Sequence, residues 1–457
     1  MVFSSSLFLF IFLPVVLLGY YFSNNKVKNI WLLLSSIIFY SWGEPKYVII
    51  MLFSIIVNYI LGIMIDRYEN IVIRKSLLSL AVILDIGVLI AFKYTNFIIN
   101  NVNSVFKTNI VISEIALPIG ISFFTFQILS YIIDVYKENV KAQKNILKLG
   151  LYISFFPQLI AGPIVRYIDI EEQLSKREIT LDQTYAGIKR FMLGFTKKVL
   201  IADTVAQAAD LAYGMQNISG VLAWIGGAAY MLQIYYDFSG YSDMAIGMGK
   251  MFGFDFMENF NFPYISKSIK EFWRRWHISL SIWFRDYVYI PLGGSRCSKL
   301  KTNRNLLIVF ALTGIWHGAS WNFVFWGLYY GIFLLLERTF FGNILKRIPV
   351  FLQRIYTLIV VYIGWIFFRA ESITSAFRYI KGLFVFNEDN WNLARQYFNL
   401  ELIFFMITGI LFAMPIFSRI EKKCNKAVLD SIIIFMFIIS ILWLVGKGFS
   451  PFLYFRF

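Results

Sequence analysis

Residues 306–338 read LLIVFALTGIWHGASWNFVFWGLYYGIFLLLER. A helix rises about 1.5 Å per residue and the hydrocarbon core of a bilayer is about 30 Å thick, so this run is too long for one simple span. We expect a turn or kink near residues 318–320, where the backbone of Gly318 can approach a ligand closely. Gly314 and Gly318 also have the small-xxx-small spacing that lets two helices touch, and helix packing is the alternative explanation for them.

The composition of the whole chain agrees with a membrane location. Apolar residues make up 58% of the 457 residues, only 15% are charged, and the mean hydropathy is +0.65. Ordinary soluble domains are far more polar. A membrane-spanning helix needs about 20 mainly apolar residues, and the apolar runs predict about 11–13 spans plus re-entrant and interfacial helices. Runs this long and without alternation do not suit a β-barrel, so we predict an all-α polytopic integral membrane protein.

No internal repeat, low-complexity tract or polar linker separates a soluble domain. The sequence therefore predicts a single membrane domain over residues 1–457. Within it, residues 1–110 form plain peripheral spans and residues 400–457 form the C-terminal spans. Residues 115–369 mix aromatic residues with Gly, Pro, Asn, Asp and Arg at membrane depth. Polar groups are costly there and tend to face an interior, so we expect the catalytic core in this middle part.

The net charge of +16 follows from loops between spans. Lys26 and Lys28 follow the first predicted span, and Arg67, Arg74 and Lys75 follow the third. By the positive-inside rule these loops lie in the cytoplasm and the N-terminus lies outside. Orientation and attraction to anionic lipid explain the charge better than nucleic-acid binding, so membrane lipids are expected partners and nucleic acids are not.

Only two histidines, His277 and His317, occur in the chain. The signatures GxSxG, P-loop, GxGxxG, HExxH and CxxC are missing, and no metal site or serine or cysteine nucleophile is indicated. An imidazole can take a proton from a hydroxyl and return it to a leaving group, as acyl transfer from a thioester to an alcohol requires. That reaction also needs donors for the oxyanion. Candidate donors beside His317 are Trp316, Trp321 and Asn322, although such residues often only satisfy local contacts.

Residues 267–290 have the pattern of one amphipathic helix at the membrane interface, ended by Pro291. Its polar side carries His277, which is a poor lipid anchor because its charge changes near neutral pH. The segment also carries many basic residues, among them Lys270, Arg274, Arg275 and Arg285. Such a surface could hold the phosphates of a donor such as coenzyme A, or it could be positive-inside charge alone. Both explanations place it on the cytoplasmic side.

A transporter or flippase is the alternative from another functional class. Acidic residues in or near spans often mark ion or proton paths, and the chain has Asp85, Asp134, Asp203, Asp237 and Asp243. Transporters commonly have duplicated halves with matched broken helices, and the sequence has no such duplication.

Several long stretches resemble the membrane-bound O-acyltransferase (MBOAT) family, in particular its bacterial alginate, exopolysaccharide and peptidoglycan O-acetyltransferase branch. The main ones are ISKSIKEFWRRWHISLSIWFRDYVYIPLGGSR at 265–296 and HGASWNFVFWG at 317–327. Others are LPIGISFFTFQILSYIIDVY at 117–136, FFPQLIAGPIVRY at 155–167 and YYDFSGYSDMAIGMG at 235–249. The likeness runs in order through most of the chain from residue 117 onward. The teichoic-acid D-alanylation branch of the same family is a neighbouring alternative.

The resemblance implies a helical enzyme of the bacterial cytoplasmic membrane with a central funnel. It implies that His317 is the principal catalytic residue and His277 the second important histidine. It also implies that acetyl-CoA is the donor substrate, with no permanently bound cofactor. The acetyl group would pass across the membrane to a polysaccharide, directly or through an external SGNH-type acetyltransferase, alongside proteins of polysaccharide synthesis and export.

Overall fold

The computed structural model describes residues 1–113, 115–386, 399–416, 420, 423–447 and 452. In this part of the chain the regular elements are helices and none is a strand, which confirms the all-α prediction. The chain forms two compact units, Met1–Phe191 with Met244–Met257, and Met192–Asp243 with Glu258–Phe457. Helices α10 and α12 contribute residues to both units. The prediction of a single membrane domain stays a prediction.

The first unit is built from the N-terminal helices. They are η1 (Phe8–Phe12), α1 (Leu13–Phe22), α2 (Asn25–Gly43), α3 (Val48–Arg67), α4 (Ile71–Leu89), η2 (Ile90–Tyr94), α5 (Thr95–Phe106), α6 (Ile121–Tyr136), α7 (Ile146–Ser154), α8 (Phe156–Leu159), α9 (Tyr167–Ser175) and most of α10 (Leu181–Thr196).

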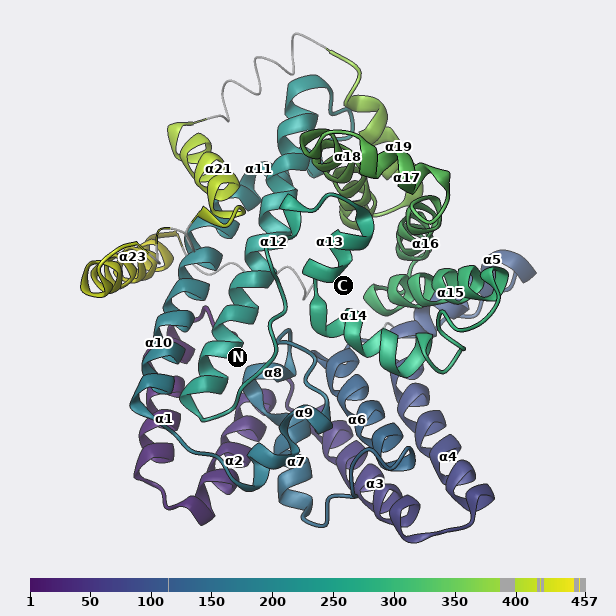
Figure 1. Ribbon diagram of the computed structural model, residues 1–457, viewed down its shortest axis with the longest axis vertical. Coiled ribbons are helices and arrows are strands. Elements are labelled where there is room, and N and C mark those ends of the chain that lie inside the picture. The colour runs from purple at the N-terminus through teal and green to yellow at the C-terminus, as the bar shows by residue number, and fades with distance from the viewer. Residues whose placement is uncertain (114, 387–398, 417–419, 421–422, 448–451, 453–457) are drawn as a thin grey trace. The chain divides into compact units, whose positions relative to one another are not determined.

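Local sequence explains where several of these helices begin. The side chains of Asn24, Asn70 and Asn145 accept backbone N–H groups from the first turns of α2, α4 and α7, as N-cap residues do. Helices α3, α4 and α6 lie side by side (Figure 1). Between α3 and α4, the buried amide of Asn58 donates to Asp85 over 2.8 Å. This bond satisfies one oxygen of a carboxyl group that would be costly to bury alone.

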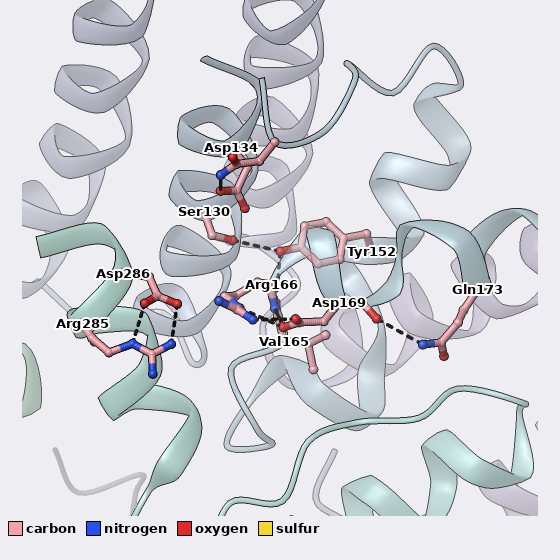
Figure 2. Close-up of polar contacts among 10 residues, drawn as sticks. Ser130, Asp134, Tyr152, Val165, Arg166, Asp169, Gln173, Arg285 and Asp286 are labelled. Atoms are coloured by element: carbon pink, nitrogen blue, oxygen red, sulfur yellow. Dashed lines mark hydrogen bonds and ion pairs between the residues drawn. The ribbon is translucent and has the colours of Figure 1, made fainter. Parts of the chain in front are cut away.

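Polar contacts also join the stretches at 117–136 and 155–167 (Figure 2). The Tyr152 hydroxyl of α7 lies 3.2 Å from the Ser130 hydroxyl of α6 and 3.0 Å from the Val165 carbonyl oxygen. Next to Val165, the Arg166 guanidinium donates two hydrogen bonds of 2.9 and 2.7 Å to the Asp169 carboxylate. In this unit hydrogen bonds through Tyr152 therefore connect the two stretches.

The second unit follows with the remaining helices. They are η3 (Lys197–Ala202), α11 (Asp203–Gly214), α12 (Gly220–Met251), η4 (Pro263–Ile265), α13 (Ile269–Arg275), α14 (Ile278–Phe284), η5 (Arg285–Tyr289), α15 (Lys299–His317), α16 (Trp321–Leu336), α17 (Phe340–Arg347), α18 (Val350–Arg369), α19 (Ile373–Gly382), α21 (Leu400–Phe412) and α23 (Lys426–Lys447).

Four helices of the described residues are long and apolar enough to cross a membrane singly: Val48–Arg67, Ile71–Phe106, Val350–Arg369 and Lys426–Gly446. A fifth span arises if α16 and α17, bent by 75° at their junction, count as one. These spans confirm a polytopic membrane protein. They are fewer than the apolar runs suggest, because many of those runs fold into shorter helices such as Ile121–Tyr136.

The run at 306–338 breaks as expected. Helix α15 ends at His317, and α16 begins at Trp321 after Gly318, Ala319 and Ser320. Helices α15 and α16 then pack closely at their glycines. A Cβ atom on Gly314 would lie 2.2 Å from the Phe323 carbonyl oxygen, and one on Gly327 would lie 2.2 Å from that of Phe310. The packing explanation is therefore confirmed for Gly314, while the break at 318–320 is confirmed as well.

We expect Gly314→Ala to lower the free energy of unfolding by about 1–3 kcal/mol, because the added methyl group needs a shift of backbone rather than of a flexible side chain. Gly87→Ala is the matched control, since a Cβ atom there meets nothing within 4 Å. Thermal unfolding of the detergent-solubilised protein would measure both. Equal midpoints for the two variants would contradict the close contact.

Candidate active site

His317 is the last residue of α15 and lies in a box of aromatic rings. Its imidazole is 5% exposed. The rings of Trp316, Trp326 and Phe368 lie at centroid distances of 5.0, 5.1 and 5.2 Å, all in edge-to-face geometry. Such surroundings exclude water, which strengthens hydrogen bonds and proton-transfer interactions at the imidazole.

His277 lies at a break between two short helices. Its backbone is in the left-handed region, with φ 45° and ψ 55°, and its side chain is 1% exposed. The prediction of one amphipathic interfacial helix over 267–290 is therefore wrong, because α13 ends at Arg275 and α14 begins only at Ile278. A left-handed residue other than glycine stores strain, which often marks a functional constraint.

The break is held by the loop before it. Phe260 and Trp276 form an isolated antiparallel bridge. On either side of it, Asn261 N–H donates to the Arg275 carbonyl over 2.9 Å and Ile278 N–H donates to the Asn259 carbonyl over 3.0 Å. The Ile278 N–H thereby bonds to the loop instead of to the Arg274 carbonyl that a continuous helix would offer, whereas the Trp276 N–H still donates to the Phe272 carbonyl and ends α13. The helical periodicity of the sequence contains no sign of it.

Asn259 is completely buried and its side chain contacts His277 directly. The Asn259 Oδ1 atom lies 3.1 Å from His277 Nδ1, and it accepts hydrogen bonds from the Ser279 hydroxyl over 2.9 Å and the Ser279 backbone N–H over 3.3 Å. Its Nδ2 donates to the Ser242 hydroxyl over 3.0 Å. Sequence analysis missed Asn259. An asparagine within the aromatic-rich stretch ENFNFPY at 258–264 was the available signal, since a buried amide needs partners.

Trp316 connects the two histidines. Its ring lies 6.1 Å from the His277 ring and 5.0 Å from the His317 ring, both edge-to-face. The structure therefore brings together both imidazoles that the sequence singled out, from elements about forty residues apart in the chain.

The other predicted oxyanion donors lie in different settings. Trp316 is 3% exposed, whereas Trp321 is 60% exposed. Asn322 is buried, and its Nδ2 donates to the carbonyl oxygens of Phe367 and Ala370 at the end of α18. Both amide hydrogens of Asn322 are thus used to join α16 to α18. Its predicted role as an oxyanion donor is untested, and these bonds would have to break first.

Sequence analysis did not single out Trp326, which is 1% exposed and packs against His317. Its Nε1–H has no acceptor among the described residues, and the same holds for Nε1–H of Trp273, whose ring lies 5.7 Å away. Leaving a buried donor without an acceptor costs about 1–3 kcal/mol. Buried polar groups of this kind require an explanation, and a bound acceptor oxygen would supply one.

Of the four predicted donor-binding cations, two form ion pairs with acids and two are exposed. Arg275 forms an ion pair of 2.9 Å with Glu271, and Arg285 forms one of 2.6 Å with Asp286. Lys270 and Arg274 are exposed, at the start and near the end of α13. The backbone N–H groups of Ile269 and Lys270 donate to the Glu337 carboxylate over 2.6 and 3.0 Å. Glu337 thereby joins the end of α16 to the helix that precedes His277.

These features describe a helical membrane protein with two buried, neighbouring imidazoles and unused buried donors beside them. The family described as MBOAT, membrane-bound O-acyltransferase, matches residues 135–377, which include both histidines. The chain belongs to this family and is an O-acyltransferase.

Curated relatives agree with this assignment. The probable alginate O-acetylase AlgI of Pseudomonas aeruginosa is 45% identical over 86% of this chain and 76% of its own length. The protein of the same name from Azotobacter vinelandii is 38% identical over the full length of both chains. The peptidoglycan O-acetyltransferase of Helicobacter pylori is 36% identical over 84% of this chain and 80% of its own length.

Proposed function

We propose that the protein transfers an acetyl group from cytoplasmic acetyl-CoA across the bacterial cytoplasmic membrane for O-acetylation of an extracytoplasmic polysaccharide. Transfer is either direct or through an SGNH-type partner, and the N-terminus lies outside. The names of the relatives, probable alginate O-acetylase and peptidoglycan O-acetyltransferase, support the acyl group and the acceptor class. The observation that carries the chemistry is the pair of buried imidazoles that both contact Trp316.

In this proposal His317 is the general base. It takes the proton from the acceptor hydroxyl as the oxygen attacks the thioester carbonyl carbon, and the C–O bond forms. The C–S bond then breaks, and the thiolate of coenzyme A receives the proton from the imidazolium. His277 positions the donor or relays a proton. Of the four predicted cations, we assign the exposed Lys270 and Arg274 to the phosphates of coenzyme A, because Arg275 and Arg285 are already paired with acids.

The oxyanion needs a donor that is buried and not already committed. Trp326 contacts His317, and its N–H lacks an acceptor in the described part of the chain, so we assign this role to Trp326. Trp316, which also contacts His317, is the second candidate. Donors fixed in a dry site stabilise the developing negative charge without reorganisation.

Trp326→Phe is therefore expected to lower kcat by about 10²-fold, since an aromatic ring remains at the position but the indole N–H is lost. Trp283→Phe is the control, because that buried ring packs against Phe284 and Tyr287. Steady-state rates with acetyl-CoA at saturation would measure the effect. A rate for Trp326→Phe equal to that of the control would remove Trp326 from the mechanism.

Proteoliposomes with radiolabelled acetyl-CoA on the cytoplasmic face test the function itself. Label that appears on an external polysaccharide, or on an added SGNH-type partner, supports the proposal. Unmodified solute that crosses without acyl transfer would support the transporter alternative instead. Each of the acids that motivated that alternative has a hydrogen-bond or ion-pair partner, so none of them on its own indicates an ion path. The partners are Asn58, Asn139, Lys197 and Lys198.

A further inference from the structure

The hydrogen bonds around Asn259 determine the orientation of its amide. The Ser279 backbone N–H lies 3.3 Å from Oδ1 and is only a donor, so the atom that faces it is the oxygen. The Ser279 hydroxyl lies 2.9 Å from Oδ1 but 3.5 Å from His277 Nδ1, so its proton goes to the amide oxygen. The Asn259 Nδ2 atom faces the Ser242 hydroxyl oxygen.

This orientation also determines the tautomer of His277. Its Nδ1 atom lies 3.1 Å from an oxygen that can only accept, so Nδ1 carries the proton. In a neutral imidazole the other nitrogen then has the lone pair. The His277 Nε2 atom is buried and has no hydrogen-bond partner among the described residues. It is therefore a buried acceptor that the fold itself does not use.

We propose that Asn259 is a positioning residue that fixes His277 in the Nδ1–H tautomer, so that Nε2 accepts a hydrogen bond or proton from the reacting molecules. That Nε2 serves the reacting molecules rests on the proposed function, whereas the tautomer rests on the hydrogen bonds of Asn259 alone. The left-handed backbone of His277 and the bond from Ile278 N–H to the Asn259 carbonyl keep the two side chains in register. Phe238 and Trp316, which pack on the ring, are uncharged, as are Asn259 and Ser279.

NMR spectroscopy can determine the tautomer of His277 directly, because the chain has only two histidines. The full-length protein with a histidine-free tag and 15N-labelled histidine gives signals from only two imidazoles, and His317→Gln assigns them. For His277 we expect a protonated Nδ1 and an unprotonated Nε2 in the wild type. In Asn259→Leu we expect a shift towards the Nε2–H form. A protonated Nε2 in the wild type, or no change in Asn259→Leu, would overturn the proposal.

Activity provides the second readout. Asn259→Leu should lose about tenfold in kcat, as expected when one hydrogen bond to a reacting group is lost. Asn259→Asp keeps the acceptor, so it should retain the Nδ1–H form and more activity than Asn259→Leu. Its carboxylate stabilises the imidazolium, so the acidic limb of its pH–rate profile should move to higher pH.

Asn305→Asp is the matched control. Asn305 is fully buried on α15, and its Oδ1 accepts from the Arg304 guanidinium, which tolerates a carboxylate. Its pH–rate profile should stay at the wild-type position. Equal losses and unshifted profiles for Asn259→Leu and Asn259→Asp would reduce Asn259 to a structural role. If the wild type shows no acyl transfer, the proposed function fails, while the 15N measurement still decides the tautomer.

Discussion

His317→Gln is expected to lower acetyl transfer from acetyl-CoA by about 10²- to 10⁴-fold, the range that general acid–base catalysis contributes. Glutamine approximates the size of the imidazole and can form hydrogen bonds, but it cannot take a proton from the acceptor hydroxyl. The box formed by Trp316, Trp326 and Phe368 should still close around it. Purified variant and wild type in proteoliposomes, compared by label transferred per folded molecule, provide the measurement.

His277→Gln separates the two histidines. If His277 only positions the donor or relays a proton, its loss should reduce the rate less than the loss of His317. A thermal midpoint close to that of the wild type is required for both variants, because each imidazole is buried. Transfer at the wild-type rate by His317→Gln would exclude the general-base assignment, whatever the behaviour of His277→Gln.

The sequence predicted features that depend on neighbouring residues. The glycine-containing turn after His317 follows from residues 306–338 alone. The aromatic and polar mixture at membrane depth pointed to residues 115–369, which contain both histidines; that these residues form the catalytic core stays a prediction. These features are local, since a helix that contains Gly318 and Ser320 and exceeds the bilayer thickness tends to break there.

The sequence could not predict features that depend on distant partners. The helical period continues through Trp276 and His277, so nothing local indicates the left-handed turn that the 259–261 loop imposes. The roles of Asn259 and Trp326 likewise depend on groups brought together by folding. Apolar composition also does not say whether a run forms one long helix or a shorter one such as Ile121–Tyr136.

Lys198 in η3 is a buried cation that pairs with two carboxylates. Lys198 Nζ lies 2.6 Å from both Asp203 Oδ1 and Asp237 Oδ1, and Lys198 and Asp237 are almost fully buried. Replacing Lys198 by Met leaves two carboxylates without their shared ammonium group. Removing one member of a buried ion pair typically costs about 3–5 kcal/mol, so Lys198→Met should unfold far below the wild-type midpoint.

Lys250→Met is the matched control, because the pair of Lys250 with Asp255 is largely exposed and such pairs contribute about 0–1 kcal/mol. Thermal unfolding in detergent compares the two variants, and similar losses of stability would contradict a buried triad.

The double variant Lys198→Met with Asp237→Asn removes one charge of each sign and should recover part of the lost stability. It also distinguishes the two functional classes, because an acyltransferase whose chemistry lies at His317 should keep its transfer rate per folded molecule. A proton-coupled transporter that uses Asp237 should lose its activity in that variant.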